Sequence, residues 1–265
     1  MERPASLIAL EEHWEATARK HTCLLGWNAG KSIPDPLTDN GTCCLVQACS
    51  ARFAVTCEHV WQGYEIFKSA NPGSRLWISL VKNDQCFTPS YAQMLSNPRA
   101  IAVNKSLDLA VFTFDQITAL EPWRFHQYQS PSREKAKKGD IVHFLGFPGE
   151  AVRAGAGERN LNYCFSSDVI HDASHSRFML HSAPGTIHHE NQVGESCAAF
   201  RICGASGAPV FKVCQNFELA LAGVVSALSS SGLGDAATAR YEMSDGDIYV
   251  THACFIQEDG SIMES

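Results

Sequence analysis

The chain has 265 residues, of which 45% are hydrophobic and 18% charged, the balance of an ordinary globular protein with a substantial core. Its formal net charge of −7 argues against non-specific nucleic-acid binding, and no run reaches the roughly 18 apolar residues of a membrane span. The N-terminal apolar run is too short for a signal peptide, so we expect a cytoplasmic chain with no nucleic-acid or membrane partner.

Cysteine usage predicts reduced thiols and no metal or other cofactor. The chain has 11 cysteines, an odd number, and several lie in apolar runs where a free thiol behaves as a small buried hydrophobe. Without an export signal, reduced cysteines are expected rather than a disulfide framework. No C-x2-C pair indicates a zinc site, and metal binding is the less favoured interpretation of the histidines in segment 171–191. Whether that segment shapes a cleft or binds a partner is left open.

The first predicted element is a helix over residues 5–18, because Leu7, Leu10, Trp14 and Ala18 recur at spacings of three and four. From residue 42 onward, short apolar runs alternate with turn residues, which predicts an all-β sandwich or barrel. The predicted strands are 42–48, 52–56, 76–81, 109–114, 141–147, 178–182, 208–213 and 219–227.

A polar segment near the middle of the chain predicts two halves. Residues 128–139 include Pro131 and a basic run at 133–138, and they are expected to form a solvated linker. The acidic, glycine-containing stretch 229–247 predicts a loop before a last element at 248–257.

Three local patterns carry residue types used in nucleophilic catalysis, and each is weak alone. His59 follows the apolar run 53–57, where a lone histidine is more often structural. Asp108 opens an apolar strand, where an aspartate is usually a turn or cap residue. Ser206 lies between Gly204 and Gly207, just before a buried strand, and glycine–serine turns are common.

Together the three patterns resemble the signature blocks of the trypsin-like serine peptidase family. The family blocks are T-A-x-H, D-[IL]-A and G-x-S-G-x-P, and here they occur in the family order with separations of 49 and 98 residues, close to the usual spacing. Residues 41–46 resemble the small-residue strand before the histidine. Residues 139–149 look like the G-D-x-V…G-[YFN]-P segment of bacterial-type members. The resemblance covers roughly residues 41–256.

The resemblance implies an all-β fold of two antiparallel six-stranded β-barrels of the chymotrypsin type, after a short N-terminal helix. The implied domains are a helix and extension at 1–40, a first barrel at 41–127, a linker at 128–139 and a second barrel at 140–265. The implied activity is that of a serine endopeptidase, whose partner is a protein or peptide substrate. The oligomeric state is not predicted.

The implied mechanism gives each residue a role. A serine hydroxyl is a poor nucleophile near neutral pH and needs a base within hydrogen-bond reach. His59 would remove the proton of Ser206 and return it to the leaving amine, while Asp108 would hold the imidazole in the right tautomer. The oxyanion would be stabilised by the backbone N–H groups of Gly204 and Ser206.

Departures from the family pattern point towards its intracellular or heat-shock-type branch. Ala205 stands where digestive members carry the aspartate that pairs with a new N-terminus after zymogen cleavage. Cys57 and Val60 replace the alanine before the histidine and the cysteine after it, so the disulfide of secreted members is absent. The oxyanion loop must therefore become ordered by other means.

Alignment from the serine implies the substrate-binding residues. Phe200 occupies the place of the aspartate in trypsin-type pockets, so a preference for lysine or arginine is not expected. An acidic preference through Arg201 is less favoured than a solvent-facing guanidinium. An extended peptide would add as a strand along residues 226–228. The implied substrate-binding residues are Phe200, Arg201, Ile202, Ser226, Ala227 and Leu228.

The residues allow three other interpretations. Segment 26–32 resembles a phosphate-binding loop, but only three residues separate its glycines and prolines follow. Segment 204–208 resembles an esterase nucleophile elbow, but only 59 residues remain for the required acid and histidine. The alternative that stays open is a catalytically silent trypsin-like fold acting as a protein-binding module.

Overall fold

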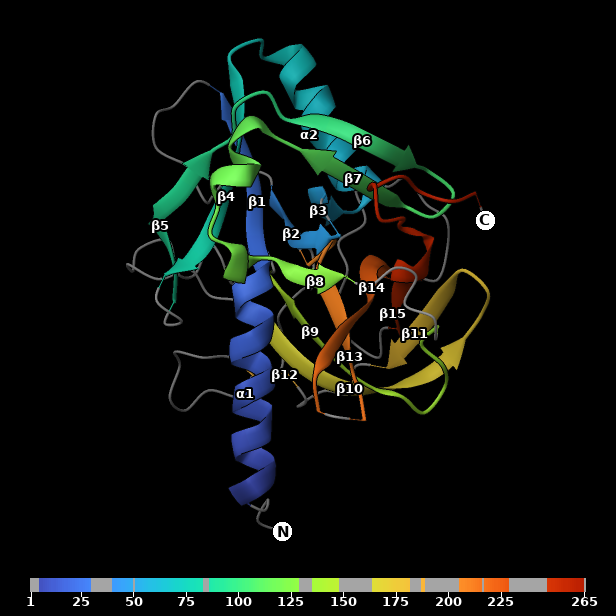
Figure 1. Ribbon diagram of the computed structural model, residues 1–265. Helices are drawn as coiled ribbons and strands as arrows, with labels where there is room; N and C mark the ends of the chain where they lie inside the picture. The colour runs from blue at the N-terminus through green and yellow to red at the C-terminus, as the bar shows by residue number, and fades with distance from the viewer. Residues whose placement is uncertain are drawn as a thin grey trace.

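The structure is a computed structural model that describes residues 5–29, 40–49, 51–82, 86–128, 135–147, 164–181, 187–188, 205–215, 217–228 and 247–264. Within these ranges the chain forms fifteen β-strands and two α-helices (Figure 1). The all-β fold with a short N-terminal helix, predicted from the sequence, is confirmed. None of the described helices is long and apolar enough to cross a membrane.

The first half of the chain forms an eight-stranded sheet. Its order is β5-β4-β1-β2-β3-β7-β6, antiparallel throughout, and β8 adds to β2 in parallel. Strand β1 comes from the segment that the sequence analysis assigns to an N-terminal extension. The strands are β1 (Thr22–Ala29), β2 (Asn40–Ala48), β3 (Ala51–Thr56), β4 (Ser74–Lys82), β5 (Cys86–Met94), β6 (Arg99–Asn104), β7 (Leu109–Thr113) and β8 (His126–Tyr128).

The second half forms a closed barrel. Its order is β11-β15-β14-β13-β9-β10-β12, and an additional pairing of β10 with β11 closes six of these strands into a ring. The strands are β9 (Ile141–Gly146), β10 (Cys164–Ala173), β11 (Arg177–His181), β12 (Ile187–His188), β13 (Pro209–Val213), β14 (Leu219–Leu228) and β15 (Asp247–His252).

The two halves share one winding pattern. Around the closed barrel the six strands follow the chain order first, second, third, sixth, fifth, fourth. The first sheet repeats this order as β1, β2, β3, β7 and β6, with β4 beside β1. Pairing of β6 with β4 would close that ring, but the described residues of these strands do not pair, and β5 lies on the outer edge of β4.

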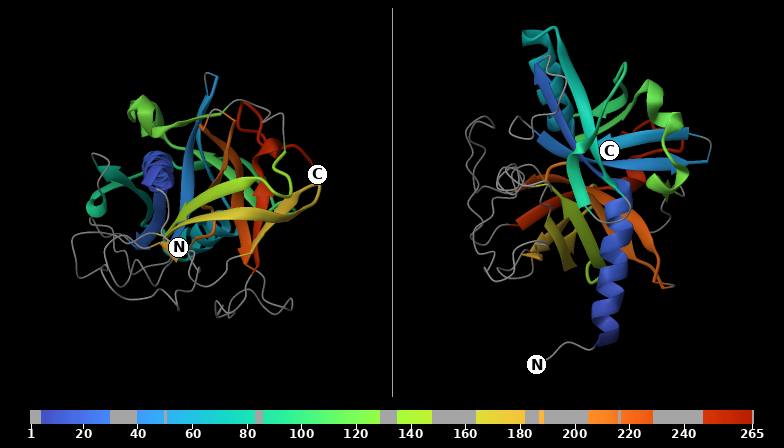
Figure 2. Two further views of the ribbon diagram at one scale, coloured as in Figure 1. Left: turned by 90° about the horizontal axis from the view of Figure 1, so that it is seen from below. Right: turned by 90° about the vertical axis from the view of Figure 1, so that its left-hand side faces the viewer.

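Helix α1 (Ala5–His21) packs against the second half, although it leads directly into the first. The indole N–H of Trp14 donates to the carbonyl of Phe217 at 3.0 Å, and its ring lies 4.5 Å from that of His143 on β9. The N-terminal end of the helix projects beyond both sheets (Figure 2). The helix therefore holds the two halves together through its C-terminal part.

Helix α2 (Glu58–Ala70) is not predicted by the sequence analysis. Cys57 takes an extended conformation at the N-cap, so the chain leaves β3 and turns at once into the helix. Val60, Trp61 and Tyr64 are buried, because the spacing of three and four places them on one helical face. Trp61 packs against Phe112 of β7, with ring centroids 5.1 Å apart. This packing fixes α2 over the end of the first sheet.

A buried histidine joins the two halves, and burial keeps several histidines neutral. Nε2 of His126 on β8 accepts the backbone N–H of Leu221 on β14 at 3.1 Å, which joins the two sheets. Burial lowers the pKa of His126 to about 3, and it lowers the pKa values of His21, His143 and His252 to about 4. An unfolded histidine has a pKa of about 6.5. The unfolded chain therefore binds more protons below that pH, and stability is lost as the pH falls from about 6.5 towards 4.

This pH dependence should weaken when His126 is replaced by glutamine. Oε1 of a glutamine can accept the N–H of Leu221 but does not titrate. Between pH 5 and 6 the slope of the unfolding free energy against pH should fall by the equivalent of about one proton. Urea unfolding at a series of pH values measures the slope. An unchanged slope in His126→Gln would show that the buried His126 does not contribute to the pH dependence of stability.

Candidate active site

Neighbouring strands bring His59 and Asp108 together. In the β3–β7 pairing Thr56 lies opposite Ala110, so the residues just after β3 face those just before β7. His59 stands in the first turn of α2. Asp108 ends the β6–β7 turn with φ +51°, a left-handed conformation that aspartate tolerates better than most residues.

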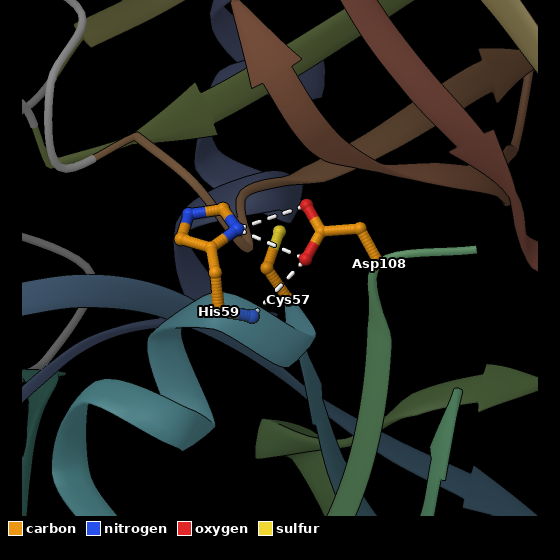
Figure 3. A group of neighbouring side chains, drawn as sticks. All are labelled: Cys57, His59 and Asp108. Atoms are coloured by element: carbon orange, nitrogen blue, oxygen red, sulfur yellow. Dashed lines mark hydrogen bonds and ion pairs between the residues drawn. The ribbon is translucent and has the colours of Figure 1, made fainter. Parts of the chain in front are cut away.

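The imidazole and the carboxylate form a close pair (Figure 3). Nδ1 of His59 lies 2.9 Å from both carboxylate oxygens of Asp108, and the backbone N–H of His59 donates to Oδ1 at 3.1 Å. An ionised carboxylate only accepts hydrogen bonds, so Nδ1 carries the proton and Nε2 is left as an acceptor. In the close-up the second ring nitrogen points away from Asp108. The His59 side chain is 48% exposed and that of Asp108 15%, so the imidazole is accessible while the carboxylate is largely covered.

The second half of the chain supports the turn that carries Asp108. Oγ1 of Thr251, on β15, donates to the carbonyl of Leu107 at 2.6 Å. The guanidinium of Arg177, on β11, donates to the carbonyl of Ser106 at 3.3 Å. No sequence pattern points to either supporting residue, because neither stands in a recognisable motif and each lies far along the chain from the turn.

Ser206 occupies a tight turn wedged between β2 and β14. The N–H of Ala208 donates to the carbonyl of Ala205 at 2.8 Å, and Gly207 has φ +86°, as the third position of a type II turn requires. The carbonyl of Ser206 accepts the N–H of Thr42 on β2 at 2.9 Å. Ser206 itself is half-buried.

Cys57 links the serine turn to the histidine. The carbonyl of Val225 accepts the N–H of Gly207 at 2.9 Å and also the thiol of Cys57 at 2.7 Å. The serine turn and the residue two positions before His59 thus share one acceptor. Within the described part of the chain, however, no hydrogen bond joins Nε2 of His59 to Oγ of Ser206.

The remaining site residues of the sequence analysis divide into two groups. The hydroxyl of Ser226 is buried and donates to the carbonyl of Tyr249 at 3.2 Å, so it faces β15. Ala227 and Leu228 pair with β15 on one side, while β13 ends its pairing at Pro209 on the other. Four predicted residues lie outside the described residues: Phe200, Arg201, Ile202 and Gly204.

Among the described residues of the histidine-rich segment, His175 contacts a lysine. Nζ of Lys135 lies 3.2 Å from Nδ1 of His175 and donates to the carbonyl of His175 at 3.0 Å. An ammonium group has only donors, so Nδ1 of His175 is the acceptor in this contact. The role of this contact is to fix the β10–β11 hairpin to residue 135.

Comparison with known proteins adds little to this geometry. No family model matches the chain. No curated protein sequence matches it either. Among solved structures it is similar to the crystal structure of Deg5, at 12% identity and a TM-score of 0.49, over 86% of this chain and 88% of that one.

Proposed function

We propose that the chain is a serine endopeptidase of the trypsin-like family, which hydrolyses peptide bonds through an acyl-enzyme on Ser206. The observation that carries the proposal is the His59–Asp108 pair, with Nδ1 held at 2.9 Å from the carboxylate. That contact leaves Nε2 free to act as a general base, which is the state the chemistry needs.

His59 accepts the proton of Ser206 during attack and gives it to the leaving amine. Asp108 stabilises the imidazolium that forms in between. In substrate-free enzymes catalytic hydrogen bonds are often long and tighten when substrate binds, so the proposal requires the His59–Ser206 contact to form in the substrate complex. The N–H groups of Gly204 and Ser206 are the proposed oxyanion donors.

An extended peptide is the proposed substrate. Beyond Val225 the edge of β14 that faces the serine turn has no strand partner among the described residues, because β13 stops pairing at Pro209. Strand addition along this edge would place the main chain of a peptide beside Ser206. The S1 roles of Phe200, Arg201 and Ile202 stay predictions.

Labelling with a fluorophosphonate tests the proposed function. Folded protein at pH 8 should become covalently labelled at one serine, because such probes react with hydroxyls that a neighbouring base activates. Ser206→Ala should abolish the label, and Ser69→Ala, which changes an exposed serine on α2, should retain it. Mass spectrometry of the labelled peptide identifies the site.

A second candidate function is a binding module with the same fold and no turnover. The missing His59–Ser206 hydrogen bond in this structure favours it. The test is fluorophosphonate labelling of the folded wild type, both with and without a peptide ligand. Absence of labelling under both conditions would favour the binding module over the peptidase.

A further inference from the structure

Cys57 gives the His59–Asp108 pair a third potential metal ligand. Sγ of Cys57, a ring nitrogen of His59 and a carboxylate oxygen of Asp108 all lie within 4.8 Å of one another, and Nδ1 is the ring nitrogen that faces Asp108. Figure 3 shows the sulfur beside the gap between the imidazole and the carboxylate. Thiolate, imidazole and carboxylate are the donors that zinc takes in proteins, and three protein ligands leave a fourth position for water.

We propose that Cys57, His59 and Asp108 form a binding site for zinc or another thiophilic divalent cation, and that occupancy switches the active site off. The binding step depends only on the three side chains, whereas the inhibition rests on the proposed peptidase function. A cation on Nδ1 would displace the proton that this nitrogen shares with Asp108, and the neutral ring would then carry a proton on Nε2 instead. The cation would therefore remove the hydrogen bond that orients the imidazole.

Charge balance favours a divalent cation at this position. A thiolate and a carboxylate carry two negative charges, which a divalent ion neutralises. Cys57 is fully buried and Asp108 largely so, and a neutral cluster costs far less in such surroundings than one with net charge. The His59 side chain is 48% exposed, so solvent reaches this ligand of the proposed site.

The distances require a small opening of the pair. Tetrahedral zinc with bonds of about 2.0–2.1 Å to nitrogen and oxygen separates those ligand atoms by about 3.3 Å. Nδ1 and the carboxylate oxygens now stand 2.9 Å apart. A rotation of the exposed imidazole can supply the difference without moving the backbone.

Without metal the thiol is neutral. Burial, and then the charge of Asp108, raises the pKa of Cys57 well above its usual value, while the charge of Arg177 acts in the opposite direction. The S–H group donates a hydrogen bond to the carbonyl of Val225. Metal binding therefore releases one proton to solvent. It also takes the thiol away from the acceptor that holds Gly207 of the serine turn.

Cadmium titration of the reduced, metal-free full-length chain tests the binding step. Cadmium prefers thiolate ligands, and thiolate-to-cadmium absorption in the ultraviolet reports the bond directly. The wild type and Cys49→Ala, which removes an exposed thiol, should bind one equivalent at the site. Cys57→Ser and His59→Ala should bind it at least about tenfold more weakly. Serine at position 57 keeps a donor for Val225, so a loss in this variant with an unchanged melting temperature reports lost ligation.

Fluorophosphonate labelling in the presence of zinc tests the inhibition. Zinc should suppress labelling of the wild type, a chelator should restore it, and Cys57→Ser should resist zinc at least about tenfold better. Equal cadmium binding by wild type and Cys57→Ser would overturn the metal site. A chain that binds cadmium through Cys57 but never labels would instead refute the proposed peptidase and leave the metal site standing.

Discussion

Asp108→Asn is expected to lower the rate of peptide hydrolysis by about four orders of magnitude while the fold stays intact. The backbone N–H of His59 donates to Oδ1 of Asp108, and this contact will hold the amide oxygen of an asparagine in the same place. The amide nitrogen then stands where Oδ2 lies now, 2.9 Å from Nδ1. The neutral amide no longer stabilises the imidazolium. Its oxygen and its nitrogen would both lie 2.9 Å from Nδ1, and when the nitrogen donates to the ring, Nδ1 becomes the acceptor. Nε2 would then carry the proton and could not receive one from Ser206.

Asp115→Asn supplies the matched control. Asp115 also lies in the first half of the chain, 47% exposed, and it pairs with Arg99 at 3.2 Å. Its replacement removes the same charge and should leave the hydrolysis rate within about twofold, because exposed ion pairs contribute little. The rate is measured on a peptide that the wild type cleaves, with melting temperatures as a check on folding. Hydrolysis by Asp108→Asn at even a tenth of the wild-type rate would exclude the proposed role of Asp108.

Local sequence patterns predict the strands better than the helix beside them. The apolar run before His59 does form β3, but α2 begins two residues after it, at Glu58. The helical spacing of Val60, Trp61 and Tyr64 was available in the sequence. The strand pattern of residues 53–57 dominates there, because only Glu58 and His59 separate it from the apolar residues of the helix. Strand β1 is also not predicted, because it follows directly on α1 at Thr22 with no turn between them.

The candidate site also has one part that sequence motifs predict and another part that they do not. The resemblance of the motifs to a known family pairs His59 with Asp108, and in the structure the neighbouring strands β3 and β7 bring the two residues together. The contacts that hold the site together span much longer separations. Cys57 reaches Val225 across 168 residues, and Thr251 reaches Leu107 across 144. No periodicity in one segment can predict such pairs, because they depend on how the two halves pack.

Gly207→Ala is expected to be among the most destabilising single substitutions in the chain. A Cβ at this position would lie 2.0 Å from the carbonyl oxygen of Thr42 and 2.3 Å from Oγ1 of Thr56. These two atoms are hydrogen-bonded to each other at 2.7 Å, and both belong to paired strands. Neither can retreat without breaking that bond. The φ of +86° adds the strain of a left-handed conformation.

Together the clash and the strain should cost about 3–5 kcal/mol in the free energy of unfolding.

Two other glycines separate the contribution of the clash from that of the backbone strain. Gly139 has φ +91° and Gly73 does not, and a Cβ on either would meet nothing within 4 Å. Gly139→Ala should therefore cost about 1–2 kcal/mol from strain alone, and Gly73→Ala almost nothing. Urea unfolding measures all three. If Gly207→Ala were no less stable than Gly139→Ala, the close packing of the serine turn against Thr42 and Thr56 would be wrong. In that case the packing against Thr42 and Thr56 would not hold Ser206 in position for catalysis.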